Sequence, residues 1–401
     1  MKSSVSYQNY YINFLITTYF FIWNIKPVFD FLFNFNPILG TALYTILLFL
    51  ITTVLFFSVF GNNKRIDFIW FFFFFFTFYI AVSALWGYSE EPLKDLSNIF
   101  VSFYMFTVLL ISREYIYVGR KMIVEGLALS IVPLTIIMLI IGVDVDGRYG
   151  NIESFHPNVV SVYMAIAAFS ASALLFGKYK RALNLCLISL SVFSLLMMKS
   201  KSTIGVLIIS FALYFLIGMK IKLWKKIWYF LLFVLFISLF LYLAKDLYLP
   251  YLDEYSTLGD GKLVFTLTGR TLIWENIIFG GYLSFFGNGV NSFVYHGPQI
   301  AEITLHSAHN EFLNNSFNYG ILGAFFYISF YLYVYRQVSK VRSKGISEDY
   351  MRFDSLFCFM AFSYFFSRSF VEAPVYYFNL PLEILVIIMA MRRGNESTSR
   401  T

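Results

Sequence analysis

The sequence predicts an all-α polytopic membrane protein with about twelve transmembrane helices and one large extracytoplasmic loop between the ninth and tenth helices. The 401 residues are 59% hydrophobic and only 13% charged, and the mean hydropathy is +0.70. An average globular domain has about 25% charged residues. Apolar runs long enough to cross a bilayer core of ~30 Å, about 20 residues each, recur along the chain. A single long segment, 245–318, interrupts this pattern.

The expected transmembrane helices follow from these apolar runs, taken in order. Nine precede the long segment, at 10–25, 40–60, 66–86, 96–112, 122–141, 157–176, 182–198, 202–219 and 226–244, and three follow it, at 319–335, 355–370 and 376–391. The first, fourth and last runs are short, and the seventh and eighth form a tight pair, so a count of ten to twelve is expected. The chain then divides into helices one to nine in 1–244, the loop in 245–318, helices ten to twelve in 319–391 and a cytoplasmic tail in 392–401.

The distribution of basic residues predicts the orientation in the membrane. If the N-terminus is cytoplasmic, the connections after the even-numbered helices and the C-terminal tail lie on its side, and they hold most of the 30 Lys and Arg residues. This is the positive-inside pattern. We therefore expect a multi-pass protein of the inner (cytoplasmic) membrane with both termini in the cytoplasm and 245–318 outside it. The net charge of +7 then reflects topology and needs no nucleic-acid partner.

Two further observations limit the class of protein. The N-terminus carries only Lys2 and lacks a small-residue cleavage site after its apolar run, so the first helix is expected to stay as an anchor. Both cysteines, Cys186 and Cys358, fall inside predicted helices. Their placement argues against a disulfide framework or a thiol site.

Three short outer segments carry cations. Arg148 lies in a glycine-bracketed turn before helix six, and Lys199 and Lys201 lie in the turn between helices seven and eight. Each of these side chains either snorkels toward lipid phosphates or joins a positive cluster suited to an anionic head group or a pyrophosphate. At the end of helix eleven, Arg368 and Glu372 are four residues apart and are expected to pair if the helix continues.

The long outer segment is predicted to be folded, because unstructured loops beyond ~12 to 15 residues are usually functional or disordered, and its composition is not that of a disordered chain. LVFTLTG is predicted to form a short strand. The stretch RTLIWENIIF at 270–279 has apolar residues at helical spacing and predicts an amphipathic helix near the membrane surface. Gly280 and Gly281 end it, and 286–289 supply a turn. Arg270 and Trp274, four residues apart, can share a face of this helix.

The second half of the loop, HSAHNEFLNNSFNYGILG, is predicted to run from a helix start into helix ten. Ser307 is the expected N-cap residue, which places His309 in the first turn. The positive helix end attracts anions there, and a neutral imidazole can accept a proton. A structural hydrogen-bonding role for His309 is the alternative. His306, His309 and Glu311 fit no standard zinc pattern, so no metal is expected.

Together these residues resemble the bacterial superfamily of O-antigen ligases and O-antigen or capsule polymerases. The resemblance rests on the many-helix architecture with one large outer loop, on GR followed by an apolar aromatic segment with Trp274, and on HSAHNEFLNN leading into NYGILG. The turn SKSTIG and the stretch from GRYGN to HPN are similar to two further family landmarks. Two departures stand out. Lys201 occupies a position where the family often has arginine, and two residues instead of one separate His306 and His309.

The resemblance implies a metal-independent glycosyltransferase without a cofactor that acts on undecaprenyl-pyrophosphate-linked oligosaccharides at the outer face of the cytoplasmic membrane. Membrane lipids and a chain-length regulator protein are the further partners that it implies. Carried over residue by residue, Arg270 matches the essential loop arginine and His309 the histidine that precedes asparagine, and both are expected to be catalytic. The residues expected to bind pyrophosphate or sugar are Arg148, Lys199, Lys201, Trp274, His306, Asn310 and Glu311.

The expected reaction is polymerisation of lipid-linked repeat units into O-antigen or into capsular or exopolysaccharide. Within the same family, the alternative is a ligase that transfers finished glycan to the lipid A core. From another class, a lipid-linked sugar flippase would predict internal repeats and ionisable residues at helix midpoints. Neither is clear in the sequence, where the charges lie at helix ends and in one loop.

Overall fold

The computed structural model of the chain describes residues 2–59, 68–87, 92–144, 147–152, 154–214, 257–258, 262–263, 270–297, 299–300, 303–304, 307–343, 348–370 and 385–389, with the single residues 224, 228, 231 and 383 between them. The helices of this part of the chain are α1 (Lys2–Asn24), α2 (Lys26–Leu32), α3 (Pro37–Val59), α4 (Phe68–Ser83), α5 (Pro92–Ile111), α6 (Arg113–Leu129), α7 (Ile131–Ile141), α8 (Pro157–Phe176), α9 (Arg181–Met197), α10 (Lys201–Leu213), α13 (Arg270–Phe279), α14 (Ser292–His296), α15 (Glu311–Ser343) and α16 (Glu348–Arg368). Within the described residues, strands form two antiparallel ladders of two-residue strands, β1 (Thr257–Leu258) with β2 (Lys262–Leu263) and β3 (Gln299–Ile300) with β4 (Ile303–Thr304).

Five helical segments of the described chain are long and apolar enough to cross a membrane: Ile38–Val59, Pro92–Ile111, Arg113–Ile141, Pro157–Phe176 and Glu311–Ser339. Three shorter apolar helices accompany them, at Ile69–Ser83, Arg181–Met197 and Lys201–Leu213. The prediction of a helical multi-pass membrane protein is therefore confirmed. The count of twelve stays a prediction, because most of 226–244 and much of 376–391 lie outside the described residues.

One predicted connection is helical in the structure. We expected a link between 112 and 122, but only Ser112 separates α5 from α6. The link is helical because its apolar residues recur at helical spacing and form one buried face, which includes Ile116 and Ile123. None of the charged residues of α6 is fully buried. This face packs on α1 at close range: a Cβ added at Gly119 would lie 2.7 Å from the Asn13 side chain. Small residues permit such close approach between membrane helices.

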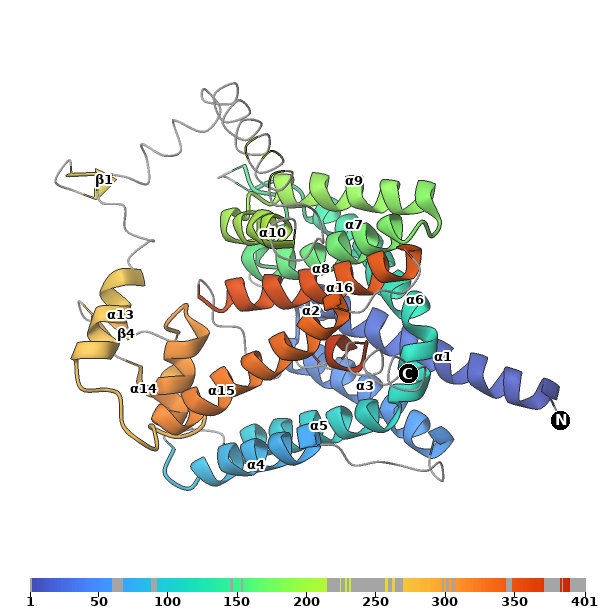
Figure 1. The fold of residues 1–401 in the computed structure, drawn as a ribbon. Coiled ribbons are helices and arrows are strands. Elements are labelled where there is room, and N and C mark those ends of the chain that lie inside the picture. The colour runs from blue at the N-terminus through green and yellow to red at the C-terminus, as the bar shows by residue number, and fades with distance from the viewer. Residues whose placement is uncertain are drawn as a thin grey trace.

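Figure 1 shows α13 and α14 at one end of the helix bundle, and the first turns of α1 at the other. We refer to the end that carries α13 and α14 as the loop end. The beginning of α15 meets the end of α16 there, since the Glu311 amide donates to the Ser369 carbonyl at 2.8 Å. Helix α8 runs antiparallel to α16: Phe169 contacts Tyr364, while a Cβ on Gly177, just after α8, would lie 2.9 Å from Phe353 near the start of α16. The first turns of α8 therefore also lie toward the loop end.

At the opposite end of the bundle, ion pairs join the helices. Arg120 of α6 contacts Asp354 near the start of α16 at 2.9 Å, and the Asp354 side chain is only 1% exposed. Lys180, just before α9, pairs with Glu125 of α6, which also accepts a hydrogen bond from the Tyr179 hydroxyl at 2.9 Å. These contacts hold α6, α9 and α16 together.

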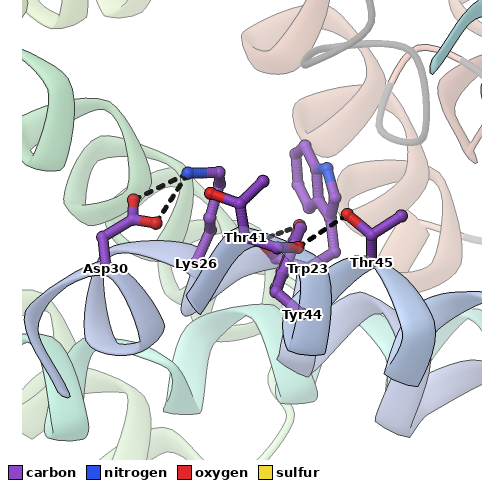
Figure 2. A network of polar contacts seen from close by, with 6 residues as sticks. All are labelled: Trp23, Lys26, Asp30, Thr41, Tyr44 and Thr45. Atoms are coloured by element: carbon purple, nitrogen blue, oxygen red, sulfur yellow. Dashed lines mark hydrogen bonds and ion pairs between the residues drawn. The ribbon is translucent and has the colours of Figure 1, made fainter. Parts of the chain in front are cut away.

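Polar contacts lie within the short helix α2 and between the helices on either side of it, α1 and α3 (Figure 2). Lys26 reaches Asp30, one turn further along α2, at 2.7 Å. The Tyr44 hydroxyl of α3 donates to the Trp23 carbonyl at the end of α1 at 3.2 Å. Both contacts stabilise the turn that returns the chain from α1 into α3.

Helix α15 is broken at Gly320, whose φ of 67° and ψ of −168° are not helical. We predicted that the histidine segment runs from a helix start into helix ten, and α15 follows this course from Glu311 to Ser343. The break at Gly320 was not predicted. The carbonyls freed by the break are bound by other parts of the chain. Asn288 donates its amide to Phe317 at 2.9 Å, and the Tyr79 hydroxyl of α4 donates to Tyr319 at 2.8 Å. Non-helical backbone inside a membrane protein is tolerated where the protein supplies such partners.

Glycine is required where the loop touches this break. A Cβ on Gly320 would lie 2.2 Å from the Phe285 carbonyl oxygen, and one on Gly287 would lie 2.3 Å from the Gly320 amide. Both glycines have positive φ, which other residues rarely adopt. The turn predicted at 286–289 is confirmed, and it packs against the break in α15.

Candidate functional site

Helix α13 packs on the segment that carries His309. It begins at Arg270 and ends before Gly280 and Gly281, as the sequence predicted. The Trp274 indole N–H donates to the Ala308 carbonyl at 2.8 Å. Ile277 and Ala308 are fully buried in a small apolar cluster with Phe293. The loop helix is therefore anchored directly beside His309.

His309 precedes α15 and is not in its first turn. The Asn310 side chain accepts the Leu313 amide at 3.1 Å, so Asn310 is the N-cap residue. Our assignment of the cap to Ser307 was wrong, because Ser307 caps a tighter turn: its hydroxyl accepts the His309 amide at 3.0 Å. His309 has a φ of 49°, a left-handed conformation that is uncommon for histidine and turns the chain into the helix.

Asn310 and Glu311 dock this segment on the end of α16. The Glu311 carboxylate accepts the Ser369 hydroxyl at 2.8 Å, and the same hydroxyl lies 3.0 Å from the Tyr331 hydroxyl. The Asn310 amide group contacts the Phe370 carbonyl at 3.4 Å. Both side chains are buried. In the structure they position His309, and their predicted contact with substrate stays a prediction.

Arg148 and Lys199 come together at the end of α9. The Arg148 guanidinium makes long contacts of 3.4 Å with the Met198 carbonyl and with Asn158. A Cβ on Gly147 would lie 3.0 Å from the Lys199 amino group. Lys201 is the exposed first residue of α10. The contact of Arg148 with a helix-end carbonyl supports a structural role, and phosphate binding by this group stays a prediction.

Of the two remaining predicted site residues, the structure describes the backbone of Arg270 and does not describe His306. Arg270 is the first residue of α13 and lies one turn, about 6 Å along the helix axis, before Trp274. The backbone therefore brings Arg270 near the residue that holds Ala308, while its side chain lies outside the described part. His306 lies outside the described residues altogether.

The sequence analysis did not include Arg368 among the candidate site residues. We expected it to pair with Glu372 if the helix continued, but α16 ends at Arg368, and Glu372 lies outside the described residues. Arg368 is only 7% exposed, and its Nε has no hydrogen-bond partner in the described part of the chain. The signal available in the sequence was an arginine at the outer end of an apolar helix.

The helix bundle, the described helices α13 and α14 and the buried polar groups beside them define a multi-pass membrane protein with a candidate site at the loop end. A family model described as O-antigen ligase matches residues 185–328. Over these residues the chain is similar to the superfamily of O-antigen ligases and polymerases. No curated protein matches the chain.

The matched region runs from α9 through the loop to beyond the break in α15. It therefore contains Arg270, Trp274 and the segment with His309, as well as Lys199 and Lys201. Arg148 and Arg368 lie outside it. The family supports a membrane enzyme of the ligase or polymerase type.

Proposed function

We propose that the protein is a glycosyltransferase that polymerises undecaprenyl-pyrophosphate-linked oligosaccharide units at the outer face of the cytoplasmic membrane. The observation that carries this proposal is the hydrogen bond from Trp274 to Ala308. It holds the helix that begins with Arg270 against the residue that precedes His309. A cationic residue and a proton acceptor are thereby kept on adjoining parts of one site.

The reaction moves a growing chain from its carrier lipid to a new lipid-linked unit. A hydroxyl oxygen of the new unit forms a bond to the anomeric carbon of the growing chain, and the bond from that carbon to the pyrophosphate oxygen breaks. The hydroxyl proton passes to His309, and undecaprenyl pyrophosphate leaves with the electron pair of the broken bond. General-base assistance of this kind contributes typically ~100- to 10,000-fold.

Cations stabilise the leaving pyrophosphate. Each charge-assisted hydrogen bond contributes ~1.5 to 3 kcal/mol, so two or three of them supply several kcal/mol if they strengthen in the transition state. Arg270 is the first candidate, because its helix is anchored beside His309. Arg148 and Lys199 form a second basic group at the end of α9.

His309 is suited to the role of base because its surroundings position it firmly. Ser307 binds its backbone amide, and the next residue, Asn310, caps α15. Glu311 then locks the start of the helix to α16. The imidazole is half-buried, which leaves it accessible to an acceptor hydroxyl.

Analysis of surface and lipid-linked glycans in a deletion strain tests the proposal. Loss of a polymerase leaves a single repeat unit on the final acceptor. Loss of a ligase leaves long lipid-linked chains with none attached to the lipid A core, and loss of a flippase leaves units on the inner leaflet. Full-length attached polymer in the deletion strain would exclude all three functions.

A further inference from the structure

Arg368 is a buried cation with unused hydrogen-bonding capacity. It is the last residue of α16 and is 7% exposed. Its Nη1 donates a long hydrogen bond of 3.4 Å to the Tyr364 hydroxyl, and its Nε has no partner among the described residues. A guanidinium carries five N–H donors in a fixed fork. Burying such a charge is costly unless it is paired and hydrogen-bonded.

A role in capping α16 does not explain this side chain. Arginine near a helix C-terminus often binds the last carbonyls. Here Ser369 fills that position, because its amide donates to the Phe365 carbonyl at 2.9 Å. The guanidinium is therefore not needed to close the helix end.

Pairing with a carboxylate does not explain it either. Glu311 is near enough for the charge of Arg368 to act on it. Its carboxylate is bound instead by the Ser369 hydroxyl at 2.8 Å, and no ion pair of Arg368 with a described carboxylate is present. Within the described residues, the guanidinium thus donates a long hydrogen bond to the Tyr364 hydroxyl, and its Nε is left without a partner.

The position of Arg368 connects it to the candidate site. Its neighbour Ser369 binds Glu311 by both backbone and side chain, and Glu311 follows His309 by two residues. On its other side, Arg368 is close enough to Tyr163 of α8 for its charge to act there. Arg368 therefore lies between α8 and the His309 segment, at the loop end of the bundle.

We propose that Arg368 binds the pyrophosphate of the lipid-linked substrate behind the His309 segment. This inference rests on the proposed function. A planar guanidinium can bind two phosphate oxygens at once, whereas a lysine ammonium acts as a point charge. Arg368 thus supplies a forked cation that Lys201, exposed at the start of α10, does not provide.

The test uses the full-length protein in nanodiscs, with undecaprenyl pyrophosphate and inorganic pyrophosphate as probes of binding. We expect Arg368→Gln to weaken binding of both probes roughly 10- to 100-fold, since one or two charge-assisted hydrogen bonds are lost. The affinity of Arg368→Lys for both probes should lie between those of the wild type and Arg368→Gln, because lysine keeps the positive charge but lacks the forked donor geometry of arginine. The melting temperature of ligand-free Arg368→Gln should equal or exceed that of the wild type, because an incompletely paired buried charge is removed.

Arg120→Gln is the matched control. It removes an arginine that is paired with Asp354 at 2.9 Å, so it should lower the melting temperature and leave the affinity of the folded protein for pyrophosphate unchanged. If Arg368→Gln also lowers the melting temperature as much as Arg120→Gln does, Arg368 is structural and the inference is overturned. Should Arg368→Gln fail to fold, wild-type affinity in Arg368→Lys overturns the inference.

Two further results separate the inference from the proposed function. Wild-type protein that binds undecaprenyl pyrophosphate, together with Arg368→Gln that binds it equally well, overturns the inference alone. Wild-type protein that does not bind the carrier overturns the proposed function as well. Nanodiscs with and without phosphatidylglycerol identify the source of the phosphate. If phosphatidylglycerol in the nanodisc displaces the pyrophosphate probes from the wild-type protein, Arg368 binds a membrane head group, and the assignment to pyrophosphate is overturned.

Discussion

The two ends of α16 differ in how a buried charged side chain is paired. Near its start, Asp354 is almost fully buried and pairs with Arg120 at 2.9 Å. At its last residue, Arg368 is buried while its Nε has no partner among the described residues. A buried charge is stable when it is paired and hydrogen-bonded. The pair at one end of the helix supports assembly of the bundle, whereas the unpaired Nε at the other end is the basis of our proposal that Arg368 binds a ligand.

Loss of His309 tests the loop end most strongly. His309→Ala should reduce polymer formation ~100- to 10,000-fold, because the proposed base is removed, while the amount of protein in the membrane stays the same. Chain length in the complemented deletion strain and membrane immunoblots are the measurements. His296→Ala, an exposed histidine of the same loop, is the control and should support normal polymer. Wild-type chain lengths in His309→Ala would refute its role as base.

Removal of Asp354 tests the opposite end. Asp354→Ala leaves Arg120 partly buried without its carboxylate, which typically destabilises a protein by about 3 to 5 kcal/mol. Thermal unfolding of the purified protein in detergent measures the effect. Lys26→Ala breaks a more exposed pair within α2, and its expected cost is below about 1 kcal/mol. Equal melting temperatures in Asp354→Ala and Lys26→Ala would show that the Arg120–Asp354 pair at the start of α16 contributes no more than an exposed pair, which contradicts its proposed role in assembly of the bundle.

Gly320→Ala tests whether the break in α15 shapes the loop end. The new Cβ would lie 2.2 Å from the Phe285 carbonyl oxygen, at a positive φ. We expect a loss of about 1 to 3 kcal/mol from backbone strain alone, with faster proteolysis of the loop. In Gly205→Ala the added Cβ meets nothing within 4 Å, and helix propensity predicts a gain of up to about 1 kcal/mol. A stable, protease-resistant Gly320→Ala would show that the break is unnecessary.

Trp274→Phe should give the smallest of these effects. It keeps an aromatic ring and removes the N–H that binds the Ala308 carbonyl at 2.8 Å. Loss of one such bond costs about 1 to 2 kcal/mol, so we expect polymer synthesis to fall roughly 10-fold, with little change in melting temperature. Trp228→Phe, at an exposed position, provides the control. An unchanged rate of polymer synthesis in Trp274→Phe would show that the hydrogen bond from α13 to Ala308 does not contribute to the site.

Local signals were sufficient for much of this protein. The apolar runs identified the helices α3, α8 and α9 within three residues at both ends, because a membrane span needs a long apolar stretch and little else. Glycines marked the end of α13 and the turn at 286–289, where the structure has Gly281, Gly287 and Gly289 at positive φ. These features depend on residues that are close together in the chain.

Features that depend on distant partners were not predictable in the same way. The break at Gly320 exists because Asn288 and Tyr79 bind the freed carbonyls. The cap of α15 shifted from Ser307 to Asn310 because two turn geometries compete at adjacent residues. Such choices depend on which donors the folded chain brings near, and no spacing along the sequence specifies them.

The sequence by itself determined a helical membrane protein, its family resemblance and the segment that carries His309. Tertiary structure alone decided how that segment is held, by Trp274 from one side and Ser369 from the other. It also decided that Arg368 lies buried behind the segment with an unpaired Nε within the described chain. The physical reason is that apolar periodicity is a local property, whereas the satisfaction of a buried polar group depends on atoms that folding brings together.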